Sequence, residues 1–143
     1  MVFFRYNLIM SNNIKRIATE KAPAAIGPYS QAAAFCSLVF TSGQIPISPI
    51  TEEISGNTVA EQTEVVIKNL KEVLLAAGSS LENVLKTTCF LTDLKNFQEF
   101  NSVYAKHFTS LPARSTVEVS ALPKGVLVEI EAVAIASAIA PAS

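Results

Sequence analysis

The chain has 143 residues, of which 50% are hydrophobic and 16% charged, and its formal net charge is −1. These values indicate one folded domain and exclude a disordered chain. The near-neutral charge and the lack of a basic run give little support for binding a nucleic-acid backbone, so a nucleic-acid partner is not expected. A single domain of this length cannot bury so much apolar surface by itself, and we therefore expect an oligomer.

Residues 1–13 are predicted to be a disordered N-terminal extension that precedes a single domain at residues 14–143. The extension begins with an apolar stretch, but this stretch is too short to span a membrane and has no signal-peptide cleavage pattern. Basic residues precede the first acidic residue, Glu20, as in a weak organelle-targeting segment. We expect a cytoplasmic protein that does not contact membranes. Mitochondrial import through the extension, or a functional start at Met10, are the alternatives.

Short strands are predicted at residues 14–19, 30–35 and 38–42, because these runs are rich in apolar and β-branched side chains. A turn is expected near Cys36. The prolines and the glycine of residues 22–29 predict a loop of fixed shape rather than a helix.

The clearest predicted helix covers residues 59–77. Its start carries the T-x-x-E pattern of a capping box, from Thr58 to Glu61, and Gly78 is expected to end it. The charged residues of one side, including Glu64, are expected to be solvated. The apolar residues share the other face at helical spacing: Val59, Val66, Ile67, Leu70, Val73, Leu74 and Ala77.

The second half of the chain predicts a strand at 85–92, a helix at 97–108 and strands at 114–119 and 126–136. The single histidine, His107, lies on the apolar stripe of that helix and is expected to be a packed structural residue.

Alternation along the last two strands places charged side chains together. Glu129 and Glu131 share one face of the final strand, while Arg114, Thr116 and Glu118 share one face of the strand before it. The order of elements predicts an α+β fold in which one mostly antiparallel sheet carries both helices on one face. The other face would stay apolar, so another copy of the chain is expected to cover it.

Metal and thiol chemistry have little support in this sequence. Cys36 and Cys89 lie in separate strand-like runs without C-x-x-C spacing, so both are expected to be reduced core residues of an intracellular protein. One histidine without a Cys/His cluster does not make a zinc site, and neither a metal nor another cofactor is expected. A histidine on a helix stripe also disfavours a Ser-His-Asp triad, and no phosphate-binding glycine loop occurs.

Arg114 stands at the predicted start of a strand, where a permanently charged guanidinium needs a partner. That partner is either a carboxylate of the same protein, which makes a structural pair, or the carboxylate or phosphate of a ligand. A metal-free site of Arg, Glu, Tyr and backbone amides would suit a small carboxylate-bearing substrate and water-mediated proton transfer.

Four segments of the chain are informative together: AAIGPYSQ at 24–31, TSGQIP at 41–46, LPARS at 111–115 and VEIEA at 128–132. In this order they resemble the RidA/YjgF family of reactive-intermediate deaminases, and the resemblance extends over residues 14–136. The resemblance implies a chorismate-mutase-like fold and a homotrimer. In that trimer the sheets would surround a central barrel and the sites would lie between subunits.

The resemblance also implies an activity. RidA proteins hydrolyse reactive 2-imino acids and their enamine tautomers to 2-keto acids and ammonia, which protects enzymes that use pyridoxal phosphate. Their substrates include 2-aminoacrylate, 2-iminopropanoate and 2-iminobutanoate. By motif, Arg114 is similar to the residue that binds the substrate carboxylate, Glu129 to the residue that activates water, and Tyr29 to a tyrosine that borders the site.

Four further residues are expected at the substrate by the same resemblance. Ser42 and Gly43 match the segment around the imine end, and Asn101 matches a helix asparagine near the site. Thr116 stands where many relatives have a cysteine, which puts any thiol-dependent behaviour of the family in doubt here. Imine hydrolysis does not need a thiol.

Two other functions remain open. A trimer of this fold could bind a small keto or amino acid as a regulator without turnover, although binding alone does not require Glu129. Endoribonuclease or translation-inhibitor activity, which is ascribed to some relatives, is disfavoured by the acidic isoelectric point and the lack of a basic stripe.

Overall fold

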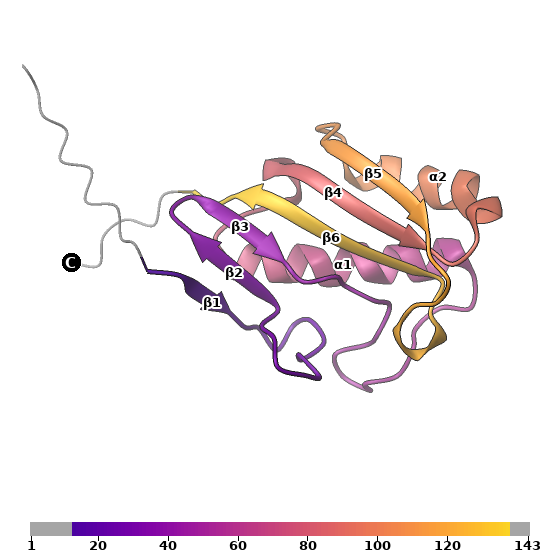
Figure 1. Cartoon of the computed structure of the whole chain (residues 1–143), viewed down its shortest axis with the longest axis horizontal. Coiled ribbons are helices and arrows are strands. Elements are labelled where there is room, and N and C mark those ends of the chain that lie inside the picture. The colour runs from indigo at the N-terminus through magenta and orange to yellow at the C-terminus, as the bar shows by residue number, and fades with distance from the viewer. Residues whose placement is uncertain (1–12, 138–143) are drawn as a thin grey trace, which may run out of the picture.

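The computed structural model describes residues 13–137, which form a six-stranded sheet with two helices on one face (Figure 1). The strand order is β1-β2-β3-β6-β4-β5, and all neighbours are antiparallel except the parallel pair β4 and β5. The predicted α+β architecture is therefore confirmed. The elements are β1 (Lys15–Ile17), β2 (Ala32–Phe35), β3 (Leu38–Thr41), α1 (Val59–Ala76), β4 (Val84–Leu91), α2 (Phe97–His107), β5 (Ala113–Glu118) and β6 (Val128–Ile135), with single 3₁₀ turns at Leu81–Asn83, Leu94–Asn96 and Pro123–Gly125.

The ends of α1 are fixed by the residues that the sequence indicated. The Thr58 hydroxyl accepts a hydrogen bond from the Glu61 backbone N–H at 3.2 Å, and the Glu61 carboxylate accepts from the backbone N–H of Asn57 and of Thr58. These backbone hydrogen bonds hold the pKa of Glu61 below its ordinary value. At the other end Gly78 adopts a positive φ of 75°, which glycine allows without strain.

Alternation along β6 sorts its side chains between the two faces of the sheet. Val128, Ile130, Ala132 and Ala134 are buried toward the helices, whereas Glu129, Glu131 and Val133 are only partly covered. The apolar face of α1 and the buried residues Phe100, Val103 and Phe108 complete this core.

The face of the sheet away from the helices, called here the open face, is turned toward the reader in Figure 1. It exposes large apolar side chains, and a shallow hollow of about 480 Å³ lies beside Phe35 and Phe40. Covering this face would bury considerable apolar surface. That another copy covers it remains a prediction. The exposed apolar residues of the face, each 37–47% accessible, are Phe35, Leu38, Phe40, Val117 and Ile135.

Two predictions about single residues were wrong. Cys36 is exposed rather than buried, because it occupies the turn between β2 and β3 with a φ of 53°; Cys89 is buried as predicted. His107 is not packed in the core but lies at the rim between the helices. Its Nε2 is 2.6 Å from a carboxylate oxygen of Glu64, which is therefore more than a solvated charge.

Within residues 13–137, neither helix combines the length and the apolar character that crossing a bilayer would require. The predicted N-terminal extension falls, apart from Asn13, outside the described residues, as do residues 138–143.

The capping box predicts a measurable contribution to stability. Thr58→Ala removes the hydroxyl that accepts from the first turn of α1, and we expect it to lower the free energy of unfolding by about 1 kcal/mol. Lys71→Ala, at an exposed position of the same helix, is the matched control and should change it by less than about 0.5 kcal/mol. Chemical denaturation of the three proteins makes the comparison, and equal stability of Thr58→Ala and the parent chain would contradict the capping role.

Candidate functional site

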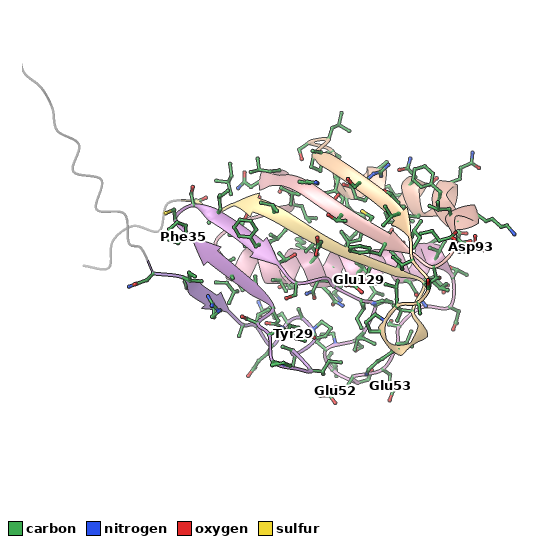
Figure 2. The ribbon with its side chains drawn as sticks, viewed as in Figure 1. Tyr29, Phe35, Glu52, Glu53, Asp93 and Glu129 are labelled. Atoms are coloured by element: carbon green, nitrogen blue, oxygen red, sulfur yellow. The ribbon has the colours of Figure 1, made fainter. Side chains whose placement is uncertain are left out.

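Glu129 projects from β6 onto the open face, beside the chain that leaves β3 (Figure 2). The backbone N–H and C=O of Gln44 pair with Ile130 at 2.8 and 3.1 Å, which draws the preceding residue, Gly43, against the Glu129 side chain. A Cβ atom on Gly43 would overlap the Glu129 carboxylate. A side chain at position 43 would therefore displace the Glu129 carboxylate from this place, and the two predicted site residues are in contact.

The environment of Glu129 favours its protonated form. Burial is the larger cause and the negative charge of Glu131, two residues along the same face, is the second; together they raise the pKa of Glu129 above its ordinary value. A half-buried carboxyl group with a raised pKa, in contact with Gly43, is suited to taking up a proton.

The loop that carries Tyr29 is tied to the end of β3. The Ser42 hydroxyl donates to the Ser30 carbonyl at 2.6 Å, and the Ser42 N–H donates to the Gln31 carbonyl at 2.9 Å. The Tyr29 ring lies over Gly27 while half of its surface stays exposed. The proton of the Ser42 hydroxyl is thus engaged by the loop, so this side chain could contact a ligand only as an acceptor.

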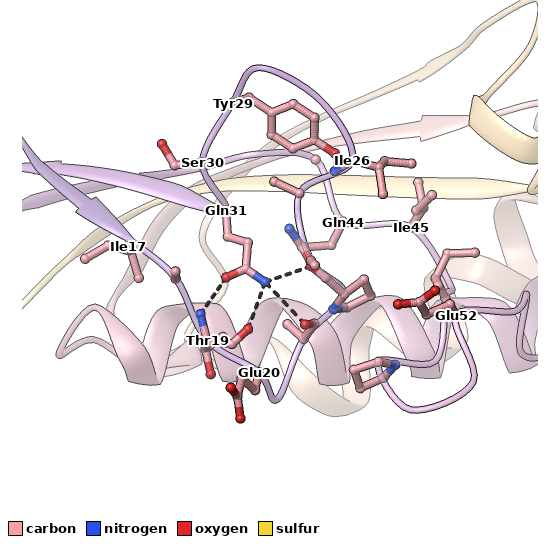
Figure 3. A pocket seen from close by; sticks show the side chains of 18 of the residues that line it. Ile17, Thr19, Glu20, Ile26, Tyr29, Ser30, Gln31, Gln44, Ile45 and Glu52 are labelled. Atoms are coloured by element: carbon pink, nitrogen blue, oxygen red, sulfur yellow. Dashed lines mark hydrogen bonds between the residues drawn. The ribbon is translucent and has the colours of Figure 1, made fainter.

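Sequence reasoning missed the residue that shapes this loop. The buried amide of Gln31 accepts from the Thr19 N–H at 2.6 Å and donates to the carbonyls of Thr19, Ala22 and Pro23 (Figure 3). Gln31 is the last residue of the AAIGPYSQ segment, so the motif did point to it. Its hydrogen-bond partners, however, lie eight to twelve residues earlier and follow no sequence period.

A cavity of about 860 Å³ lies beneath the loop that carries Tyr29 (Figure 3). Gln31 and Gln44 are among the residues that line it. Tyr29, Ser30 and Gly43 border this cavity, whereas Glu129 is not among its lining residues. Its apolar lining includes Ile17, Ile26, Ile45, Ile47 and Pro49.

Arg114 lies on β5, an edge strand, and faces α2. Its Nη1 donates to the side-chain oxygen of Asn101 at 2.7 Å, and its guanidinium carbon is 4.7 Å from the centre of the Tyr104 ring. Within residues 13–137, no carboxylate lies within ion-pair distance of Arg114. A structural Arg–Glu pair in this chain is therefore excluded, and guanidinium N–H groups remain for a ligand anion.

Thr116 lies on the same face of β5, opposite Cys89 in the register of the two strands. Its hydroxyl oxygen is closed off from solvent and has no hydrogen-bond partner among the described residues. Burial raises the pKa of the neighbouring Cys89 thiol to about 11, so this thiol is inert at neutral pH. The expected contact of Thr116 with substrate remains a prediction.

The predicted site residues fall into two groups that one chain does not bring together. The register pairs Phe90 with Glu129 on the open face, and Thr87 with Arg114 on the helix face. Arg114 is also two strands and three residues away from Glu129, about 14 Å along the sheet at the usual strand spacing. We call Tyr29, Ser42, Gly43 and Glu129 the carboxylate half-site, and Asn101, Arg114 and Thr116 the arginine half-site.

Comparison with known proteins gives consistent matches along the chain. A family model described as "Endoribonuclease L-PSP" matches residues 19–136. Human 2-iminobutanoate/2-iminopropanoate deaminase is 46% identical over 136 residues, which are 94% of this chain and 99% of the human protein. The crystal structure of the E. coli YjgF gene product has a TM-score of 0.81 at 46% identity, with 85% of this chain and 98% of that chain covered. E. coli TdcF with bound serine has a TM-score of 0.82 at 46% identity, with 86% and 99% covered.

The electrostatic coupling between Glu131 and Glu129 predicts a titration shift. Removing the Glu131 charge by Glu131→Gln should lower the pKa of Glu129, because ionised Glu129 then loses a repulsive neighbour. Carboxyl ¹³C NMR titration of Glu129 measures the shift. Glu118→Gln removes a carboxylate on the distant strand β5, whose oxygen accepts from the Leu94 N–H, and should leave the Glu129 titration unchanged. An unaltered Glu129 curve in Glu131→Gln would contradict the coupling.

Proposed function

The chain belongs to the endoribonuclease L-PSP family, which includes the RidA/YjgF proteins, and from this membership we propose that it hydrolyses reactive 2-imino acids to 2-keto acids and ammonia. One observation carries the proposal: Arg114 is held by Asn101 and the Tyr104 ring, and no carboxylate among residues 13–137 pairs with it. An arginine fixed in this way is suited to a ligand carboxylate.

Substrate binding would begin at the arginine half-site. Asn101 occupies one N–H of Arg114, and the remaining donors can grip a carboxylate through two parallel hydrogen bonds. The related TdcF, whose crystal structure contains serine, binds an α-amino carboxylate. A 2-imino acid carries its carboxylate on the carbon next to the imine, so the same grip would place the imine carbon at a fixed distance from Arg114.

Hydrolysis would take place at the carboxylate half-site. Glu129 would accept a proton from a water molecule as the water oxygen bonds to the carbon of the protonated imine, which gives a neutral amino alcohol. Glu129 would then return this proton to the amine nitrogen. As the carbon–nitrogen bond breaks, the hydroxyl proton would pass back to Glu129, which releases ammonia and leaves the 2-keto acid. A positioned carboxylate base typically contributes about 10²–10⁴-fold, and the raised pKa of Glu129 strengthens it as the base that takes the proton from water. Backbone groups of Ser42 and Gly43 would face the imine end, and Tyr29 would border the site.

The two half-sites lie on opposite faces of one sheet, so a complete site would combine Arg114 of one copy with Glu129 of another. We infer a homotrimer in which neighbouring copies meet in this way. Its formation would also cover the exposed apolar residues of the open face. The reaction as written needs no cofactor, and the partners are the small substrate and two further copies of the chain.

A second candidate function is the binding of a small carboxylate without turnover. It is favoured because the arginine half-site alone contains the groups that would bind the carboxylate. RNA cleavage is less well supported, because the chain is acidic overall and the described residues include a single histidine, engaged by Glu64. We further propose a cytoplasmic location, with organelle import as the alternative.

Glu129→Gln separates hydrolysis from binding. The amide keeps the shape of the side chain but cannot accept the proton, so the turnover number for 2-iminobutanoate should fall by roughly 10²-fold or more. Affinity for 2-ketobutyrate should change little, because Arg114 is untouched. Rapid-mixing assays with the imine made from threonine, together with calorimetric titration of the keto acid, provide the two measurements.

Glu131→Gln is the control for this experiment. It should retain turnover, and the acid limb of its pH profile should move to lower pH as the Glu129 pKa falls. Undiminished turnover in Glu129→Gln would contradict the proposed base, whereas tight keto-acid binding by a parent chain without turnover would favour the binding-only candidate.

A further inference from the structure

A group of buried residues beneath Arg114 takes no part in the proposed reaction. The Tyr104 ring on α2 lies under the guanidinium, with 4.7 Å between the Arg114 carbon Cζ and the ring centre. The Tyr104 hydroxyl shares a hydrogen bond of 2.7 Å with the Thr87 hydroxyl of β4, and both residues are buried. In the strand register Thr87 is the direct partner of Arg114. These contacts connect the Arg114 guanidinium, the Tyr104 ring and the Thr87 hydroxyl to one another.

One hydrogen bond does not fix the plane of a guanidinium. The bond from Arg114 Nη1 to Asn101 holds one nitrogen, but the group can still rotate about that contact. Aromatic rings add a further constraint: the guanidinium carbon lies 4.7 Å from the Tyr104 ring centre, 5.6 Å from that of Phe97 and 6.0 Å from that of Phe100. Tyr104 is the nearest of the three, and a tilted guanidinium loses contact with its ring. Two parallel hydrogen bonds to a carboxylate require a fixed guanidinium plane, so the orientation of Arg114 determines how strongly it binds the carboxylate.

The Tyr104 ring is itself held from several directions. It stacks on Phe108 with ring centres 4.3 Å apart and meets Phe100 at 5.7 Å. Burial raises the pKa of Tyr104, so its hydroxyl stays protonated at neutral pH and can take part in the bond to Thr87. The Cys89 thiol donates a long bond of 3.8 Å to the same Thr87 oxygen.

Packing alone does not explain the hydroxyl pair. Phenylalanine and valine would fill nearly the same volume without burying two polar groups, and a buried pair that is fully bonded mainly specifies geometry. The pair links α2, which carries Asn101 and Tyr104, to the strand beside Arg114.

We propose that Tyr104 is a positioning residue for Arg114: its ring sets the plane of the guanidinium, and its hydrogen bond to Thr87 sets the ring. The carboxylate as the ligand of Arg114 rests on the proposed function, whereas the orientation of the guanidinium does not.

The experiment uses the full chain and five variants, with 2-ketobutyrate as the binding probe and 2-iminobutanoate as the substrate. Tyr104→Leu removes the ring and should weaken keto-acid affinity and raise KM about tenfold, the scale of one partly desolvated cation–π contact, with a smaller change in kcat. Tyr104→Phe and Thr87→Val each remove the same hydrogen bond and should each cost about threefold. Their combination should cost no more than the larger single effect. Thr87→Ser keeps the hydroxyl and should bind nearly as the parent chain does.

Two further measurements separate positioning from folding and from the choice of ligand. Val66→Ala, in the core of α1, lowers stability without touching Arg114 and should leave affinity unchanged. Arginine-selective ¹⁵N NMR without ligand should show slow rotation of the Arg114 guanidinium in the parent chain and faster rotation in Tyr104→Phe and Tyr104→Leu. Equal rotation and equal affinity in parent and variants would overturn the positioning role while leaving the function intact. Restricted rotation in a parent chain that neither binds nor hydrolyses these compounds would instead overturn the proposed function alone.

Discussion

Successive side chains of a strand point to opposite faces of a sheet, and the arrangement of the candidate site depends on this constraint. Arg114 shares a face with Thr87 and is held against α2, whereas Glu129 shares a face with Phe90 and points away from the helices. No rotamer change within one chain removes the intervening strand β4. Because of this separation, the proposed reaction requires more than one copy of the chain. Burial of the exposed apolar side chains of the open face would drive the copies to associate.

Each half-site is built by a different kind of interaction. At Glu129 the determining factor is space, since Gly43 leaves room for the carboxylate and partial burial beside Glu131 raises its pKa. At Arg114 the determining factor is orientation, since Asn101 and the Tyr104 ring hold the guanidinium. This division matches the two tasks of imine hydrolysis, because proton transfer needs a tuned pKa and carboxylate recognition needs a set geometry.

The elements and their faces were predictable because they follow local periods and caps. The capping box at Thr58, the buried stripe of α1 and the alternation along β6 all lie where the pattern indicated. The motifs also supplied Arg114 and Glu129 as candidate site residues, but not their placement on opposite faces of the sheet. That placement follows from the strand order, in which β6 inserts between β3 and β4, and no local period encodes it. Contacts between distant segments, such as those of Tyr104 and Gln31, were missed for the same reason.

In the proposed assembly, each complete site takes Arg114 from one copy and Glu129 from another. Subunit mixing tests it most directly: Arg114→Ala and Glu129→Gln chains, each inactive alone, are unfolded together in equal amounts and refolded. In a ring of three with random assembly, about one quarter of the sites would pair an intact Arg114 with an intact Glu129, and imine hydrolysis should recover to that share of the parent activity. Mixed assemblies that remain as inactive as the separate variants would contradict the claim, because a site built within one chain gains nothing from mixing.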